Sequence, residues 1–283
     1  MGLTMAGEPT FGVSSFESDD FTRTRERLHS DDFSALIYGR IGALRVKDFC
    51  STAIRKRLLD EISTQSSEPY TYWPGTGAGD QQVYLGVRRV GEPFNASYSG
   101  SAAARDRYYV EAERQAHELS APFSTDAHPM VRLRQEIGTL WPGGVRPAAF
   151  EGREMSQQLV RIVTAEESHL GSQQPHFDCL PQRYAPLEAQ FAACIYLEMP
   201  SAQGALELWP VPRYSHAQIG AIDPSCDLRA MWPDPHSIVP TEGDLILFDT
   251  RRPHCVAGFT SGRRVSLHCF IGLTGEGGLV TWI

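Results

Sequence analysis

Three residues in the second half of the chain carry side chains that bind metal ions. His176 and Asp178 form an HxD triplet in the segment QQPHFDCL, and His254 ends the segment GDLILFDTRRPH. In an extended segment, residues i and i+2 point to the same side, about 6.6 Å apart along the strand. An imidazole and a carboxylate at this spacing can therefore converge on one cation. The triplet alone is weak evidence, because the same pattern also arises by chance as a hydrogen-bonded surface pair.

The segment before His254 strengthens the hypothesis of a metal site. GDLILFD is apolar on both faces, which is typical of a deeply buried strand, and a short polar bend then delivers His254 at the end of that strand. Two histidines and one carboxylate on one face of a metal leave its other positions open, as in non-haem Fe(II) oxygenases. Zinc would accept the same ligands, so these three residues leave the metal undecided.

The segment RRVSLHCFIG, which follows His254, predicts a strand with two different faces. Val265, Leu267, Cys269 and Ile271 share an apolar face that must pack in the core or against helices. The opposite face is more polar and carries Arg264, Ser266, His268 and Phe270. A guanidinium inside a barrel needs a carboxylate partner, and its planar fork suits a bidentate one. Arg264, with Ser266 nearby, is thus predicted to bind one carboxylate of a diacid.

In combination these motifs resemble a known family. An HxD triplet, a distal His after a GDLxxFD-like strand, and then an Arg ten and a Ser twelve residues later resemble the Fe(II)/2-oxoglutarate-dependent oxygenase superfamily, in its prolyl-hydroxylase-like branch. The resemblance covers roughly residues 157–275. It implies a double-stranded β-helix, or jelly roll, with Fe(II), 2-oxoglutarate and O2 as cofactor and co-substrates. It also implies functional residues: His176, Asp178 and His254 as iron ligands, Arg264 on the distal carboxylate of 2-oxoglutarate, and Ser266 assisting.

The resemblance predicts hydroxylation of a polar small molecule, such as an amino acid, a nucleotide or a biosynthetic intermediate, with release of succinate and CO2. Because Asp178 occupies the position that halogenases leave open for halide, hydroxylation, desaturation or cyclisation is favoured over halogenation. A protein side-chain hydroxylase is an alternative that a long open groove would favour. A non-redox cupin-like metal-binding protein or a zinc-dependent hydrolase are further alternatives. A cupin-like binding protein would not be expected to bury Arg264, and a zinc-dependent hydrolase needs an additional catalytic acid or base.

Three further residues are candidates for contact with the substrate. Arg161 lies on the predicted strand before the HxD triplet, Glu207 lies in ALELWPV, and His268 shares a face with Arg264. Each has an ordinary structural alternative, namely a solvated strand residue or a satisfied core histidine. The aromatic residues of the Gly-rich segment YTYWPGTGAGDQQ are candidates for a lid, or for pinning a surface loop.

Composition excludes several other classes of protein. The 283 residues carry a formal net charge of −8, and the basic residues are scattered, which argues against nucleic acid as a partner. No apolar run approaches the length of a membrane span, and the N-terminal segment lacks the features of a secretory signal, so a cytoplasmic enzyme is expected. The six cysteines form no CxxC pair and are interpreted as reduced, mostly packed thiols. The oligomeric state is left open.

The elements that must position the site are predicted from hydrophobic periodicity. Residues 1–30 are polar and weakly periodic and are interpreted as a mobile arm. Residues 31–283 are expected to form one oxygenase domain, helix-rich over 31–150, with the jelly-roll core and metal site in 151–283. Helices are predicted after Asp48 as a cap, over 102–119 and over 129–140, and the later segments are read as short strands. The fold class is therefore α+β, with a β-sandwich or barrel whose helices pack outside one sheet.

Overall fold

A computed structural model describes residues 21–72, 82–95, 101–120, 128–165, 174–202, 204–223 and 226–283. The helices are α1 (Ser30–Ile37), α2 (Thr52–Ser63), α3 (Ala102–Ser120), α4 (Pro129–Leu140) and α6 (His216–Gly220). The strands of the first half are β1 (Thr22–Arg25), β2 (Ala43–Val46), β3 (Glu68–Tyr72), β4 (Gln82–Val90), β5 (Val145–Pro147) and β6 (Ala149–Phe150). Those of the second half are β7 (Arg153–Glu154), β8 (Leu159–Thr164), β9 (Leu187–Glu198), β10 (Leu206–Leu208), β11 (His236–Ile238), β12 (Leu245–Asp249), β13 (His254–Val256), β14 (Arg263–Thr274) and β15 (Leu279–Trp282).

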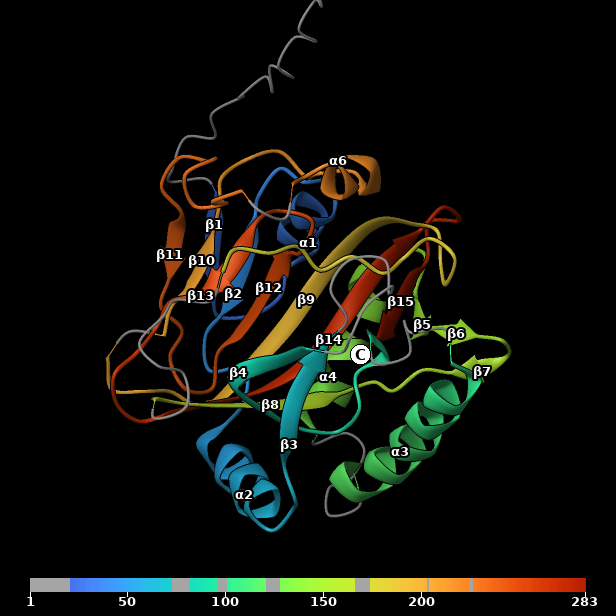
Figure 1. The fold of residues 1–283 in the computed structure, drawn as a ribbon, viewed down its shortest axis with the longest axis vertical. Helices are drawn as coiled ribbons and strands as arrows, with labels where there is room; N and C mark the ends of the chain where they lie inside the picture. Colours follow the sequence, from blue (N-terminus) through green and yellow to red (C-terminus); the bar gives the residue numbers. More distant parts are fainter. Residues whose placement is uncertain are drawn as a thin grey trace, which may run out of the picture.

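Two sheets face each other and form the double-stranded β-helix that the sequence predicts. The large sheet has the order β1-β2-β12-β9-β14-β8-β4-β3, and β15 and β5 extend it beside β14. The small sheet has the order β11-β10-β13. In Figure 1 the long strands β9 and β14 run through the middle of the molecule, and the small sheet lies to one side of them. The α+β class and the jelly-roll core are therefore confirmed.

The long strands β9 and β14 separate an apolar outer face from a more polar inner face. Val265, Leu267 and Cys269 on β14 belong to the same buried cluster as Leu58 of α2 and Leu133 of α4. The alternate residues of β14, which include Arg264 and His268, point between the two sheets and line a cavity there. The two-faced pattern predicted for this strand is thus confirmed, and the helices do pack outside one sheet.

The predicted helices are present, with one correction at a cap. α3 and α4 match the predicted ranges closely, whereas the first predicted helix begins later than expected, because its N-cap is Ser51 rather than Asp48. The Ser51 hydroxyl accepts a hydrogen bond from the backbone N–H of Ile54. Asp48 has a positive φ of 49°, which turns the chain before the helix and is incompatible with the extended backbone of an N-cap.

The end of the predicted N-terminal arm belongs to the large sheet. β1 pairs in parallel with β2, and Phe21 is fully buried among residues of β2 and β12. The polar composition of the segment hid this pairing, because the residues of β1 itself are Thr and Arg and only the neighbouring Phe21 and Leu28 are buried apolar side chains in the described part of the segment. Residues 1–20 lie outside the described part of the chain. The region 31–150 also contributes strands β2 to β6 beside its helices.

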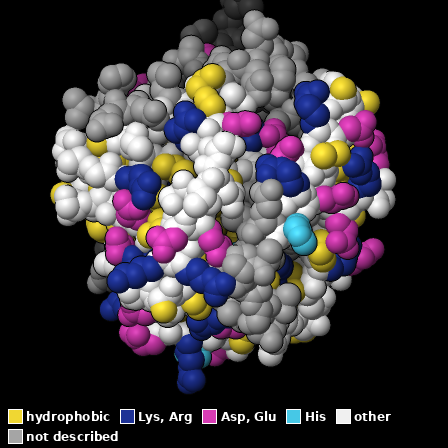
Figure 2. Space-filling view, turned by 90° about the horizontal axis from the view of Figure 1, so that it is seen from below, with side chains coloured by type: hydrophobic (Ala, Val, Ile, Leu, Met, Phe, Trp, Pro, Cys, Tyr) yellow, Lys and Arg dark blue, Asp and Glu magenta, His cyan; other side chains and the backbone are white. Residues whose placement is uncertain are grey.

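The described surface carries both signs of charge close together. Figure 2 shows basic and acidic side chains interspersed over the face seen from below, with no large area of a single sign. Among the described residues, no helix is both long enough and apolar enough to cross a membrane.

Candidate metal centre and its cavity

His176, Asp178 and His254 come together at one end of the space between the sheets. Their ligand atoms all lie within 4.8 Å of one another. The segment with the HxD triplet is extended and bridges β13, because the backbone groups of His176 and His254 exchange two hydrogen bonds of 3.0 Å. The two imidazole rings lie 4.5 Å apart, and His254 Nε2 lies 3.4 Å from a carboxylate oxygen of Asp178. The i, i+2 spacing therefore does place both HxD side chains beside the distal histidine.

The surroundings of the two histidines suit a divalent metal. His176 Nδ1 lies 3.0 Å from the carbonyl of Gln174, and His254 Nδ1 lies 2.9 Å from the carbonyl of Arg252. A backbone carbonyl at Nδ1 favours the tautomer with a proton on that atom, which leaves Nε2 as the ligand atom. Burial and the neighbouring His254 lower the pKa of His176 to about 4, so its imidazole is neutral at pH 7. Neutral imidazole is the form that binds metals.

Asp178 completes the group as a carboxylate. Burial alone would raise the pKa of Asp178, but its hydrogen bond with His254 and its electrostatic interactions with the two histidines and Arg161 hold that pKa well below its usual range. The group thus offers two imidazole nitrogens and one carboxylate oxygen from one side, which is the donor set that Fe(II) takes in non-haem oxygenases. The residues present therefore fit iron.

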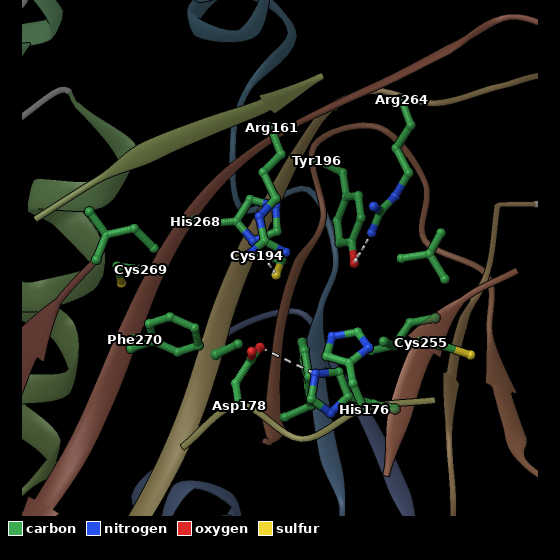
Figure 3. A pocket seen from close by; sticks show the side chains of 16 residues that line it. Arg161, His176, Asp178, Cys194, Tyr196, Cys255, Arg264, His268, Cys269 and Phe270 are labelled. Carbon is green, nitrogen blue, oxygen red and sulfur yellow. Dashed lines mark hydrogen bonds and ion pairs between the residues drawn. The ribbon is translucent and has the colours of Figure 1, made fainter. Parts of the chain in front are cut away.

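Arg264 projects into the same space as the metal-binding group (Figure 3). It is 3% exposed, its guanidinium lies over the ring of Tyr196 at 5.0 Å, and its Nη2 donates to the Tyr196 hydroxyl at 3.3 Å. No carboxylate of the described residues pairs with it, and its Nε is buried without a hydrogen-bond partner. A buried guanidinium in this state requires an anion, which is the property predicted for a receptor of 2-oxoglutarate.

Arg161 reaches the cavity from β8, opposite Ser266 of β14. Its Nη2 donates to the Tyr70 hydroxyl at 3.1 Å, and its guanidinium lies over the Tyr70 ring at 4.7 Å. Its Nε is also buried and without a partner. Burial opposes the charge of Arg161, but Tyr70 and Asp178 raise its pKa above the usual value, so the side chain stays protonated.

His268 and Ser266 form a buried polar pair near Arg161 and Arg264. The Ser266 hydroxyl lies 2.7 Å from His268 Nε2, and the Cys194 thiol lies 3.2 Å from His268 Nδ1. Burial and the charges of Arg161 and Arg264 lower the pKa of His268 well below its usual value, so the ring is neutral. His268 lines the cavity, whereas Ser266 is fully buried and contacts His268.

Glu207, the third candidate for substrate contact, lies away from the cavity. Its carboxylate accepts a hydrogen bond of 2.6 Å from Arg229 and one of 3.1 Å from the Cys255 thiol. On β10 the flanking residues Leu206 and Leu208 face the core between the sheets, so the alternation of the strand turns Glu207 to the opposite side. The expectation that Glu207 binds substrate is therefore corrected to a structural role.

A cavity of about 500 Å³ opens beside the metal-binding group. Among the described residues its lining contains one acidic side chain, Asp178, and two guanidiniums, Arg161 and Arg264. Most of the remaining lining is apolar and includes Val87, Phe94, Val163, Val256, Phe270, Trp282 and Ile283. This size and composition are those of a small-molecule site. Trp73, which the sequence suggests for a lid, lies outside the described residues.

Two tyrosines of the site were not assigned to the arginines from the sequence. Tyr196 pairs in register with Ser266, and this neighbouring position on β9 brings it beside Arg264. Tyr70 was considered only as part of a lid, yet β3 carries it to Arg161. The sequence signal for Tyr196 was its alternation with Cys194 in the apolar central part of β9, but the pairing register of the strand cannot be predicted from one sequence.

Comparison with known proteins agrees with this geometry. Residues 162–272 match the family model described as the 2OG-Fe(II) oxygenase superfamily. The L-gamma-glutamyl-L-propargylglycine hydroxylase of Streptantibioticus cattleyicolor is 25% identical over 269 residues, which cover 90% of this chain and 92% of that protein. An N-substituted L-amino acid dioxygenase of Burkholderia ambifaria has a similar fold, with a TM-score of 0.57 and 14% identity over 90% of this chain and 91% of the other. The same values hold for its structure in complex with alpha-KG.

These findings confirm the resemblance to the 2OG-Fe(II) oxygenase superfamily. They indicate a 2-oxoglutarate-dependent dioxygenase that uses Fe(II), and the His176, Asp178 and His254 group is able to bind that metal.

Proposed function

We propose that this protein hydroxylates an amino-acid-like small molecule, with His176, Asp178 and His254 as iron ligands. The observation that carries the proposal is the pairing of this metal-binding group with Arg264, a buried guanidinium that no described carboxylate compensates. Arg264 binds the distal carboxylate of 2-oxoglutarate, and the hydroxyl of Tyr196 lies beside it to share that contact. Bound iron with 2-oxoglutarate and O2 supplies the oxidant for a C–H bond, and the products are succinate, CO2 and the alcohol.

The substrate class is supported by the relatives and by the cavity. One relative hydroxylates a gamma-glutamyl amino acid, and the other is a dioxygenase of N-substituted L-amino acids. The cavity of about 500 Å³ has the volume of a metabolite site rather than the extended groove that a protein substrate requires. A small amino acid derivative is therefore favoured over a protein side chain.

The alternative functions receive no comparable support. A cupin-like binding protein gives no reason for the buried cation of Arg264 in contact with the cavity. A zinc-dependent hydrolase needs a catalytic acid or base near the metal. The described lining of the cavity offers no carboxylate besides Asp178, which belongs to the metal-binding group.

The test is the coupling of succinate release to Fe(II), O2 and 2-oxoglutarate. Wild-type protein is incubated with 2-oxoglutarate and N-acylated amino acids, with and without a chelator, and succinate is quantified. We expect succinate that depends on iron and O2. Asp178→Ala and His254→Ala reduce it to background, because each removes a metal ligand. Glu198→Gln, which changes a surface ion pair with Arg263, serves as the control and retains activity. Succinate formation independent of iron would refute the proposal.

A further inference from the structure

Two arginines of the cavity form the same unusual arrangement. Arg264 lies over Tyr196 and Arg161 lies over Tyr70, and in both pairs the guanidinium donates to the hydroxyl of its tyrosine. In both pairs the arginine Nε is buried and has no partner. Neither guanidinium pairs with a carboxylate among the described residues, although other buried arginines of this chain do so. The cavity thus contains two receptors for anions, and the proposed function uses one of them.

The charges of the loaded site leave Arg161 uncompensated. Fe(II) and Arg264 together bring three positive charges, and Asp178 with the two carboxylates of 2-oxoglutarate brings three negative ones. Arg161 then remains as a buried cation beside a neutral centre. His268 next to it is neutral and provides no counter-charge. Because an unpaired charge away from water costs several kcal/mol, a further anion is expected when the cavity is filled.

The lining of the cavity also limits what else the substrate carries. A free amino acid brings an ammonium group within a few ångströms of its carboxylate, and an ammonium requires an acidic partner when it is removed from water. Apart from Asp178, the described lining has no acidic side chain, and the positions around Arg161 and Tyr70 include the apolar side chains of Val87 and Val163. An amide nitrogen next to the carboxylate fits this surface, whereas an ammonium does not.

We propose that Arg161 and Tyr70 bind a free carboxylate of the substrate, and that the nitrogen next to this carboxylate is acylated. The Tyr70 hydroxyl accepts hydrogen bonds from Arg161 and from Asn95, so its own proton can be donated to the bound carboxylate. Arg161 is then the residue that determines specificity for N-acylated amino acids with a free carboxylate. This inference rests on the proposed function, and it assigns the second anion receptor of that same site.

The test measures binding to the protein loaded with Fe(II) and 2-oxoglutarate without O2. The probes are N-acetyl-L-norvaline and N-propionyl-L-norvaline, their carboxamides, and free L-norvaline. Binding is followed by the change of the visible charge-transfer band. We expect each acylated carboxylate to bind about 30-fold or more tightly than its carboxamide and than the free amino acid. We expect Arg161→Gln to remove this preference and to leave 2-oxoglutarate affinity within about 2-fold of wild type. Tyr70→Phe is expected to reduce the preference for the carboxylate only partly.

Arg88→Gln is the matched control, since Arg88 lies on the neighbouring strand β4 and donates to the Ser67 hydroxyl at 2.8 Å, away from the cavity lining. It is expected to bind all probes like the wild type. Equal binding of carboxylate and carboxamide, or no binding of any carboxylate probe, would overturn the inference while the band itself still supports the proposed function. A loss of 2-oxoglutarate affinity in Arg161→Gln would instead assign Arg161 to the co-substrate. Absence of the band would refute the proposed function itself.

Discussion

Two groups of largely buried arginines, one near the turn after β12 and one in the cavity, treat their charge differently. Near the turn after β12, Arg213 and Arg252 both pair with the carboxylate of Asp249, and Arg252 also donates to the carbonyls of Gly39 and Val211. In the cavity, Arg161 and Arg264 donate to tyrosine hydroxyls and lie over the same tyrosine rings, and neither forms an ion pair with a carboxylate of the described residues. In the first region, a carboxylate of the protein itself compensates the arginine charges. The second leaves its charge without a carboxylate partner among the described residues, and we propose that a ligand compensates it.

The difference between the two groups is tested most strongly by replacing Asp249, the acid that Arg213 and Arg252 share. Asp249→Asn is expected to lower the free energy of unfolding by roughly 3–5 kcal/mol, because it leaves the buried charges of Arg213 and Arg252 without a partner. Chemical denaturation measures the effect. Glu198→Gln, at the exposed pair with Arg263, serves as control and should cost less than about 1 kcal/mol. Equal losses in the two variants would contradict the distinction.

In the cavity, we expect the replacement of an arginine to weaken 2-oxoglutarate binding rather than to lower the free energy of unfolding. Arg264→Gln is expected to raise the 2-oxoglutarate concentration needed for half-saturation by about 100-fold, since a charge-assisted bidentate contact is lost. The free energy of unfolding should stay the same or rise, because an uncompensated buried charge is removed. Titration calorimetry and denaturation measure the two quantities. Arg263→Gln, one residue earlier on β14, should change neither; a marked loss of stability in Arg264→Gln would place Arg264 with the structural arginines.

A buried titratable group can also be kept neutral in the folded protein, as His128 is at the start of α4. His128 caps this helix by accepting the N–H of Met130 on Nδ1, at 3.2 Å, and burial with the nearby Arg134 lowers its pKa to about 4. The unfolded chain binds this proton near pH 6.5, so the folded state loses stability as pH falls from about 6.5 to 4, by up to about 1.4 kcal/mol per pH unit.

His128→Asn keeps a cap that does not titrate. The slope of unfolding free energy against pH over this window should therefore become shallower by the contribution of one proton. Denaturation at several pH values compares the two slopes. An unchanged slope would mean that His128 is already protonated in the folded protein.

The smallest expected effect concerns Ser266, which the resemblance assigns to 2-oxoglutarate. Its hydroxyl contacts His268 instead of the cavity, so Ser266→Ala should weaken 2-oxoglutarate binding only about 5-fold, through a loosened His268. The same titration as for Arg264 measures it. An effect as large as that of Arg264→Gln would mean that Ser266 contacts the co-substrate directly.

The sequence predicted the parts of the site whose spacing is local. The HxD triplet and the alternation on β14 follow from the two-residue period of a strand, and the structure brings these side chains together as expected. Contacts that depend on strand register could not be predicted from the sequence, since Tyr196 and Tyr70 reach their arginines only through the pairing of separate strands. Glu207 was misplaced for a different reason, because the pattern of a short strand does not reveal which of its faces turns inward.

At the N-terminal side, composition was a poor guide to pairing. The four residues of β1 are alternating Thr and Arg, a polar pattern that a sheet edge accepts because only one face packs on the core. The neighbouring acid Asp32 forms ion pairs with both Arg23 and Arg25 at that edge. Such a contact joins residues seven to nine positions apart and has no signature in hydrophobic periodicity.

The measurement that tests the central claim most directly is an anaerobic titration of Fe(II) and 2-oxoglutarate into the metal-free protein. We expect a weak visible charge-transfer band that requires both additions, is lost in His254→Ala, and needs much more 2-oxoglutarate in Arg264→Gln. Iron binding without this band, or a band that persists in His254→Ala, would contradict the assignment of the metal centre and its co-substrate.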